Sequence, residues 1–137
     1  MTKDKIFRIA SQTKAIVSVG IMMLQEEGKI LLSDNLSKYI PEFEHTKVAL
    51  ALSEQRKKGN MNAHRIVKAK RQIRIRDLLT HTAGIGYGYG PAKKKWEKAG
   101  IQGWYFAHRN EPVLETVKRM AKLPMDAHPG ERYVYGY

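Results

Sequence analysis

Hydrophobic residues dominate the stretch from Ala15 to Leu24, which would place apolar side chains on nearly every face of a helix. A helix that is apolar on all faces is typically a buried one. Ser11 stands before the stretch and Gly28 after it, and these residue types favour the start and the end of a helix. The sequence therefore predicts a buried helix from about Ser11 to Glu27.

Shorter elements are expected along the rest of the chain. Helices are predicted at residues 36–39, 48–58, 77–81, 92–99 and 112–122. Pro112 in the first turn and Pro124 after the last turn support the last of these helices. Strand-like patterns occur at 29–32 and at 73–76, where isoleucines alternate with arginines. Helices therefore dominate the pattern, and no repeat or flexible linker divides the chain.

Several common kinds of site are not indicated. Residues 84–90 read Gly-Ile-Gly-Tyr-Gly-Tyr-Gly, a loop without the strand context or G-x-x-x-x-G-K pattern of a phosphate-binding loop. The five histidines have no metal-ligand spacing, and the absence of cysteine excludes disulfides and thiolate metal sites. No apolar run reaches the roughly 18 residues of a membrane span, and no signal peptide opens the chain. We expect no metal and no cofactor.

The chain has 137 residues, 42% of them hydrophobic, which is enough for one domain with a modest core. Its net charge is +12 and is concentrated in two clusters. The first cluster comprises Lys47, Arg56, Lys57, Lys58, Arg65, Lys68, Lys70, Arg71 and Arg74, and the second comprises Lys93, Lys94 and Lys95. One interpretation is a phosphate-binding surface for nucleic acid or an anionic envelope. The other, which we favour, is a solvated face, because no aromatic residues interleave with the first cluster as base-stacking platforms would.

The candidate chemistry lies at Ser11 and Lys14, which are three residues apart and would share one face of the predicted helix. A serine hydroxyl becomes a good nucleophile when a neighbouring base takes its proton. Lysine can be that base if burial or a nearby cation makes its ammonium form costly. The helix N-terminus would also favour a developing oxyanion. On spacing alone, a simple N-cap serine beside a solvated lysine is the alternative.

Four ordered stretches around this pair resemble the serine β-lactamase-related hydrolases: class C β-lactamases, penicillin-binding proteins and β-lactamase-fold esterases. The stretches are residues 7–14 with the apolar helix running to 26–30, residues 36–43, residues 73–85 and residues 129–135. The first contains the S-x-x-K signature, and the third is similar to the family's I-x-I-x-x-L-L-x-H-x-x-G stretch. The fourth resembles the approach to the family's catalytic tyrosine.

The resemblance implies roles for individual residues. Ser11 would be the acylated nucleophile, with its backbone N–H as an oxyanion donor, and Lys14 would be its base. Tyr135 would be a second base that activates Ser11 or the deacylating water; the alternative is an ordinary aromatic residue. Tyr137 stands where the family often has Asn, which fits the esterase-like branch better than a typical β-lactamase. His81 matches a structural position and is expected to be a buried hydrogen-bonding residue.

Aromatic residues near these motifs could line a pocket for the acyl group, although ordinary core or surface positions explain them equally well. They are Tyr87, Tyr89, Trp104, Tyr105 and Tyr137.

The resemblance also implies parts of the fold that cannot be placed in this sequence, above all a K-T-G-like or H-x-G strand after the tyrosine. We therefore expect residues 1–137 to be a single partial domain, truncated at both ends, from the nucleophile helix to the Tyr loop. The expected fold class is mainly α, the helical portion of a β-lactamase/transpeptidase-like α/β fold with most of the antiparallel sheet missing. Helices that lack their sheet should expose apolar surface, which predicts association or aggregation. Family members are often exported.

The predicted function is serine hydrolysis by acyl transfer, and we expect this piece to be inactive by itself. The substrate would be a small-molecule carboxylic ester, with a D-alanyl peptide or a β-lactam as further choices. The alternative is a non-catalytic basic module that binds nucleic acid or an anionic surface.

Overall fold

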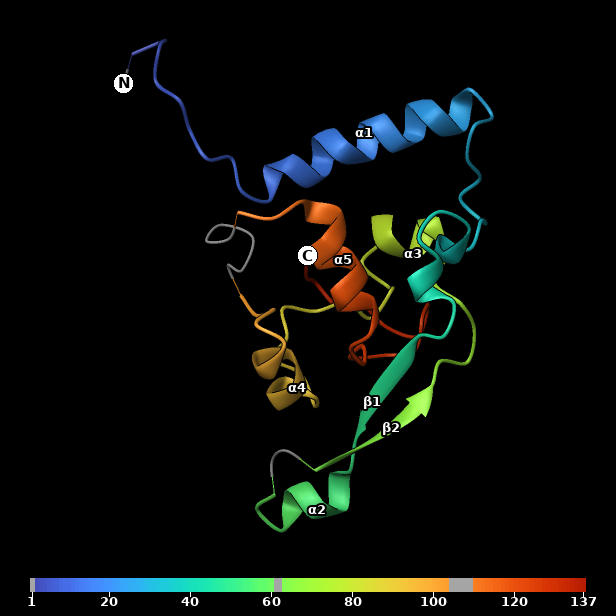
Figure 1. Cartoon of the computed structure of the whole chain (residues 1–137), viewed down its shortest axis with the longest axis vertical. Coiled ribbons are helices and arrows are strands. Elements are labelled where there is room, and N and C mark those ends of the chain that lie inside the picture. Colours follow the sequence, from blue (N-terminus) through green and yellow to red (C-terminus); the bar gives the residue numbers. More distant parts are fainter. Residues whose placement is uncertain (1, 61–62, 104–109) are drawn as a thin grey trace. The chain divides into compact units, whose positions relative to one another are not determined.

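The structure is a computed structural model that describes residues 2–60, 63–103 and 110–137 (Figure 1). The chain divides into two compact units, Met1–Leu32 and Ser33–Tyr137, called here the first and second units, and each is described by itself. Within the described ranges, no helix combines the length and the apolar character needed to cross a membrane.

The first unit contains one helix, α1 (Gln12–Glu26), as the hydrophobic pattern predicts. Gly28, with φ of 70°, ends it, because its N–H bonds to the Gln25 carbonyl and the Lys29 N–H bonds to the Leu24 carbonyl. These two bonds form a Schellman motif. The second of these bonds uses the backbone N–H of Lys29, the first residue of segment 29–32. This segment is not a strand, so the prediction of a strand there is wrong.

The prediction that α1 is buried is also wrong, because none of its residues is buried. Ile16, Val17 and Val19 are each more than half exposed, at 64%, 56% and 61%. The physical reason lies in the even distribution of apolar side chains around the helix. Such a helix needs neighbours on every side, and the first unit contains no second helix or strand among its described residues.

The second unit contains short elements in a mainly helical arrangement. In chain order they are the 3₁₀ helices η1 (Leu36–Lys38) and η2 (Pro41–Phe43), β1 (Lys47–Ala51), α2 (Ser53–Lys57), β2 (His64–Lys68), α3 (Ile75–Leu79), α4 (Lys93–Lys98) and α5 (Val113–Ala121). The predictions of short helices at 36–39, 92–99 and 112–122 are confirmed to within about a residue at each end. Residues 84–90 form no helix or strand, as predicted.

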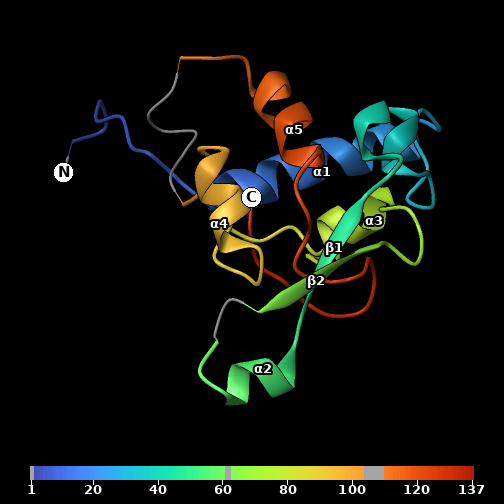
Figure 2. The same cartoon turned by 60° about the horizontal axis from the view of Figure 1, so that its bottom comes forward.

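The strands β1 and β2 pair antiparallel, with Lys47 opposite Lys68 and Ala51 opposite His64, and lie side by side in Figures 1 and 2. The predicted helix at 48–58 is therefore wrong over its first half, where Val48 and Ala49 are buried strand residues. A short apolar run fits a strand or a helix equally well, and its pairing with a distant segment decides the outcome.

The strand predicted at 73–76 is also wrong. Arg74 forms only an isolated bridge with Asn35, and Ile75 already begins α3. The Asp77 carboxylate accepts the Arg74 N–H at 2.8 Å, which caps the helix at this point.

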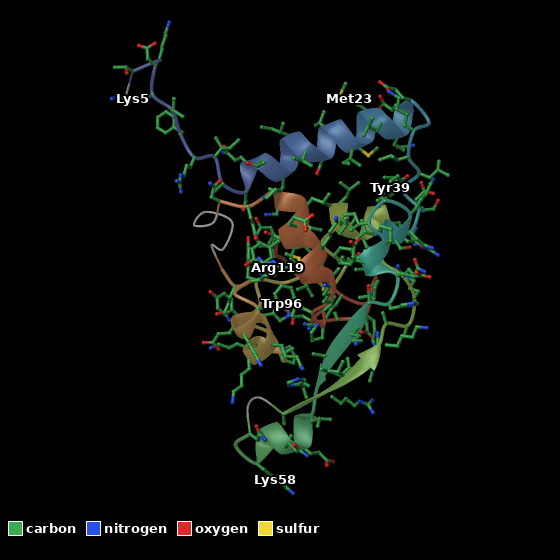
Figure 3. All side chains as sticks on the ribbon, viewed as in Figure 1. Lys5, Met23, Tyr39, Lys58, Trp96 and Arg119 are labelled. Carbon is green, nitrogen blue, oxygen red and sulfur yellow. The ribbon has the colours of Figure 1, made fainter. Side chains whose placement is uncertain are left out.

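The largest fully buried side chains of the second unit are Trp96, Phe43, Ile73, Ile101, Met125 and Val48. Trp96 lies on α4 (Figure 3). Its indole N–H donates to the Pro124 carbonyl at 2.9 Å and so joins α4 to the segment after α5. Met125 in turn exchanges hydrogen bonds with β1, because its N–H donates to the Lys47 carbonyl and its carbonyl accepts the Ala49 N–H, both at 2.8 Å. The core therefore ties α4, the end of α5 and the hairpin together.

Candidate functional site

Ser11 is the N-cap residue of α1, and Lys14 lies one turn further on, with its N–H bonded to the Ser11 carbonyl at 3.1 Å. The Ser11 side chain is exposed and makes no capping hydrogen bond to the helix. Lys14 is half-buried. The hydroxyl is therefore not committed to capping, which leaves it available for chemistry.

The backbone at the start of α1 is unusual. Ala10 has φ of 46°, a left-handed conformation that costs a non-glycine residue roughly 1–2 kcal/mol. The N–H groups of Gln12 and Thr13 donate to the carbonyls of Ile9 and Ala10, both at 3.0 Å. The Ser11 N–H has no acceptor among the described residues. It is thus a backbone donor left open beside the Ser11 hydroxyl.

In the second unit, the segment that carries Tyr135 is held against residues 81–86. The Gly130 N–H donates to the Thr82 carbonyl and the Val134 N–H donates to the His81 carbonyl, both at 2.8 Å. A side chain at Gly136 would lie 2.2 Å from the Ile85 carbonyl oxygen, so only glycine fits between the two segments. Stretches 73–85 and 129–135, two of the four that resemble the serine β-lactamase-related hydrolases, therefore pack directly on each other.

Tyr135 belongs to a cluster of aromatic rings. Its ring centroid lies 4.7 Å from that of His81 and 5.9 Å from that of Tyr87, and Tyr87 lies 5.1 Å from Tyr137 in an edge-to-face arrangement. The Tyr137 hydroxyl donates to the Gly103 carbonyl at 2.8 Å, and burial raises the pKa of Tyr137 to about 12. Tyr137 is therefore a neutral phenol with its proton engaged, whereas Tyr135 is 42% exposed.

The loop at 84–90 packs on the carboxylate of Asp126. A Cβ at Gly86 or Gly90 would lie 2.4 Å or less from one of its oxygens, so both glycines are needed for this close approach. The Oδ1 atom is buried and has no hydrogen-bond partner among the described residues. Burial raises the pKa of Asp126, and the positive charge of Arg132 offsets only part of that effect.

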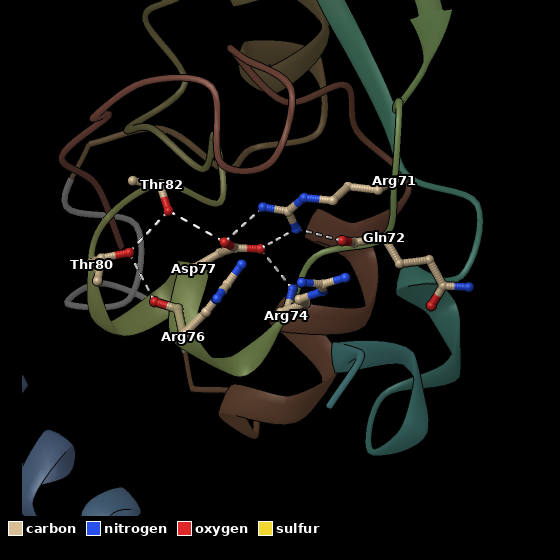
Figure 4. A network of polar contacts seen from close by, with 7 residues as sticks. All are labelled: Arg71, Gln72, Arg74, Arg76, Asp77, Thr80 and Thr82. Carbon is tan, nitrogen blue, oxygen red and sulfur yellow. Dashed lines mark hydrogen bonds and ion pairs between the residues drawn. The ribbon is translucent and has the colours of Figure 1, made fainter. Parts of the chain in front are cut away.

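An ion pair supports the segment with residues 81–84 (Figure 4). The Arg71 guanidinium donates to both carboxylate oxygens of Asp77, at 2.6 and 2.9 Å, and Thr82 donates to the same carboxylate at 3.4 Å. Burial by itself would raise the pKa of Asp77. The hydrogen bonds from Arg71 and from the Arg74 N–H outweigh it, so the pKa lies below that of an exposed aspartate. A Cβ at Gly130 would lie 2.2 Å from Nη2 of Arg71, so the guanidinium also touches the segment that carries Tyr135.

The candidate residues fall in both units. Ser11 and Lys14 belong to the first unit, and Tyr87, Tyr135 and Tyr137 come together in the second unit.

The remaining aromatic candidates do not belong to this cluster of rings. Tyr89 is 62% exposed and lines a pocket of about 440 Å³ with Asp126 and Arg132. Trp104 and Tyr105 lie outside the described residues.

His81 differs from its prediction, because it is half-buried rather than buried, has φ of 54° and presents its ring to Tyr135. Sequence reasoning also missed Arg71, Asp77 and Asp126 as supporting residues. The sequence signal for Asp77 is that a single acidic residue follows a run of basic residues. The signal for Asp126 is a single acidic residue in a short segment between Pro124 and Pro129.

Within the part of the chain that the structure describes, no group of three or more His, Cys, Asp or Glu side chains could hold a metal ion. The groups assembled around Tyr135 are phenols, an imidazole and backbone amides, which suit proton transfer and hydrogen bonding.

Comparison with known proteins gives consistent results. The chain matches the Beta-lactamase family over residues 1–136. It is 33% identical over 144 residues to Protein Rv1367c of Mycobacterium tuberculosis, covering 100% of this chain and 31% of that protein. It is 30% identical over 135 residues to a putative D-alanyl-D-alanine carboxypeptidase of Salmonella agona, covering 98% of this chain and 26% of the relative. The chain thus spans less than a third of the length of these relatives.

Two solved structures share the fold. EstCE1, described as a hydrolase with promiscuous acyltransferase activity, superposes with a TM-score of 0.70 and 27% identity over 99% of this chain and 31% of that chain. Simvastatin synthase (LovD) from Aspergillus terreus superposes with a TM-score of 0.63 and 21% identity over 94% of this chain and 29% of that chain. The helix-rich chain with its two-stranded antiparallel sheet therefore corresponds to part of a β-lactamase fold.

Proposed function

The chain belongs to the beta-lactamase family, and on this basis we propose that it carries the nucleophile and the catalytic tyrosine of a serine acyl-transfer site. Ser11 is the nucleophile, Lys14 is its base and Tyr135 is the second proton-transfer group. The observation that carries the proposal is the geometry at the start of α1. There, an uncommitted hydroxyl and an open backbone N–H belong to the same residue, one turn before a half-buried lysine.

In the proposed reaction, the amine form of Lys14 takes the Ser11 hydroxyl proton as the oxygen attacks an ester carbonyl. The oxyanion that develops on the carbonyl oxygen accepts the Ser11 N–H. The alcohol leaves with the proton, and an acyl-serine remains. Water then attacks the acyl-serine while the Tyr135 oxygen accepts its proton and the Tyr135 O–H passes its own proton to the departing Ser11 oxygen, which releases the carboxylic acid, the free Ser11 hydroxyl and a neutral Tyr135.

The environment of Tyr135 supports its part in this scheme. Its neighbour Tyr137 uses its proton on the Gly103 carbonyl, while Tyr135 is partly exposed and rests on the ring of His81. The backbone bonds from residues 81–82 and the Arg71–Asp77 pair behind them fix the loop. A proton-transfer group has to be held in one place to act efficiently, and this loop provides that support.

A small carboxylic ester is the proposed substrate class, ahead of a D-alanyl peptide or a β-lactam. The position that often carries an Asn amide in the family is Tyr137 here, and its single O–H is engaged by Gly103. It therefore offers no free donor to an amide-containing substrate. The solved structure described as a hydrolase with promiscuous acyltransferase activity, at 27% identity, supports acyl transfer as the reaction class.

The test is active-site labelling with a fluorophosphonate, which phosphonylates activated serines. Peptide mass spectrometry after trypsin digestion should find the adduct on the peptide spanning residues 9–14, and Ser11→Ala should abolish it. The labelling should be measured to completion rather than as turnover, because the adduct reports the nucleophile alone.

The matched control is Ser18→Ala, which removes another hydroxyl from the same helix and should leave labelling unchanged. An adduct that persists in Ser11→Ala, or that is spread over several serines, would contradict the proposal.

A further inference from the structure

A pocket of about 370 Å³ on the second unit is surrounded by lysines, and none of the residues assigned to acyl transfer lines it. Its basic residues are Lys47, Lys95, Lys98 and Lys122, and no acidic residue lines it. The rest of its wall is apolar, with Ile66 and Leu123 among its residues. The pocket therefore combines four ammonium groups with a hydrophobic surface.

These ammonium groups have no carboxylate partners among the described residues. Elsewhere in the second unit, Lys38, Lys70 and Lys118 each form an ion pair. The four lysines of the pocket form none, and all four are exposed. The pocket is thus a local excess of positive charge without an internal counter-ion.

The walls of the pocket are held in place by hydrogen bonds. The Trp96 indole N–H on α4 donates to the Pro124 carbonyl at 2.9 Å. The next residue, Met125, donates its N–H to the Lys47 carbonyl of β1 at 2.8 Å. Arg119 of α5 donates to the Ala99 carbonyl at 3.1 Å. Because all three elements are linked, the pocket exists before any ligand arrives.

Helix ends do not account for so much positive charge. The C-termini of α4 and α5 lie at this pocket, and each carries at most about half a negative charge. Two such ends offset about one of the four ammonium charges, which leaves about three. Lys47 also faces Lys68 directly across the hairpin, an arrangement that is destabilising for like charges. A bound anion would relieve this repulsion.

We propose that this pocket binds a small phosphate ester. The phosphate oxygens would be bound by the ammonium groups of Lys95, Lys98, Lys122 and Lys47, and the organic group would rest on Ile66 and Leu123. The volume falls within the range of small-molecule sites, at the lower end. This inference concerns the second unit and does not depend on the acyl-transfer proposal.

The test is calorimetric titration of the whole chain with phenyl phosphate and, separately, with inorganic phosphate. Phenyl phosphate should bind more tightly, because its ring adds apolar contact, and its affinity should fall as salt screens the charges. Phenyl phosphate should also displace the chain from phosphatidylglycerol vesicles if the chain binds them. Binding to vesicles that phenyl phosphate does not displace would overturn the proposal in favour of a lipid surface.

The variant Lys95→Gln with Lys98→Gln should weaken binding of phenyl phosphate by about tenfold or more, because both charges lie at the pocket. The matched control is Lys57→Gln with Lys58→Gln, which removes the same charge at α2 and should change the affinity less than twofold. Equal weakening by both variants would show a nonspecific charge effect and would overturn the proposal, as would no binding at all.

A measurement on the unaltered chain serves as a second test. Phenyl phosphate should protect Lys95, Lys98 and Lys122 from acetylation by an activated acetyl ester, as followed by peptide mass spectrometry. Lys57 and Lys58 should react at an unchanged rate. Protection that is uniform over all lysines would contradict a defined site.

Discussion

Arg71 donates to both carboxylate oxygens of Asp77, at 2.6 and 2.9 Å, and Asp77 is only 2% exposed. The same carboxylate accepts the Arg74 N–H and so also fixes the start of α3. This ion pair lies behind the segment that carries His81, whose carbonyl holds the loop of Tyr135. The partly buried Arg71–Asp77 pair therefore supports the segment against which the Tyr135 loop is held.

Replacing Asp77 with Asn should destabilise the second unit by about 3 kcal/mol, because it leaves the Arg71 charge without its partner. The folded-state pKa of Asp77 is lowered, so its stabilising effect is present above the unfolded value of about 3.9 and is lost as pH falls through the folded value. Urea unfolding at several pH values should show this acid-side loss in the unaltered chain and not in the variant. Glu131→Gln, which removes the exposed pair with Lys70, should have little measurable effect.

Ionisation of Asp126 should destabilise the second unit, whereas ionisation of Asp77 stabilises it. Its folded-state pKa is raised, so it destabilises the fold as pH rises from the ordinary carboxyl value through the folded one. Asp126→Asn keeps the shape against Gly86 and Gly90 and removes the buried charge. It should raise the free energy of unfolding at pH 7 on the order of 1 kcal/mol, and less at pH 4. Glu97→Gln on α4 makes the same charge change at an exposed position, and an equal pH-dependent gain there would rule out burial as the cause.

Gly84 should not tolerate a side chain. It has φ of 80°, and a Cβ would lie 2.3 Å from the Ala127 carbonyl oxygen. Gly59 has φ of 89° but has open space around the same position, so it isolates the backbone effect. Gly59→Ala should cost roughly 1–2 kcal/mol, and Gly84→Ala roughly 1–3 kcal/mol more because of the overlap. Similar losses in thermal melts of the two variants would contradict this packing.

Removing the Tyr135 hydroxyl should slow hydrolysis without disturbing the fold. Tyr135→Phe keeps the ring against His81 and Tyr87, and proton transfer by a positioned group contributes about 10²–10⁴ in rate. We therefore expect the hydrolysis of p-nitrophenyl acetate that remains in a single-turnover assay, where slow chemistry is still measurable, to fall by about 10² or more. Tyr133→Phe removes a hydroxyl from another ring that contacts His81 and should stay within about twofold. Equal rates for both variants would exclude Tyr135 as a catalytic group.

The parts of the fold that sequence predicted well are those set by local signals. The helix α5 follows from Pro112 and Pro124, and the end of α1 follows from Gly28. The hairpin was missed because β1 is a short apolar run and β2 contains three basic or histidine residues, so only their pairing over distance makes them strands. The exposure of α1 was missed because periodicity reports which faces are apolar and carries no information about available neighbours.

The residues of the candidate site also divide into those that local sequence motifs predict and those that only contacts between distant segments reveal. Ser11, Lys14 and Tyr135 stand in short motifs that can be read from the sequence. The groups that position them depend on contacts between distant segments. Arg71 meets Asp77 and Gly130, and Asp126 packs beneath Gly86 and Gly90, and none of these contacts has a signature within a few residues.

The most direct measurement of the central claim is the rate at which a fluorophosphonate labels Ser11 with and without the Lys14 amine. Lys14→Gln should slow this labelling by about 10² or more, because the serine loses the base that takes its proton. Lys5→Gln, an equal change of charge outside the helix, should leave the rate within about twofold. Labelling of Ser11 at the same rate in Lys14→Gln as in the unaltered chain would contradict the account.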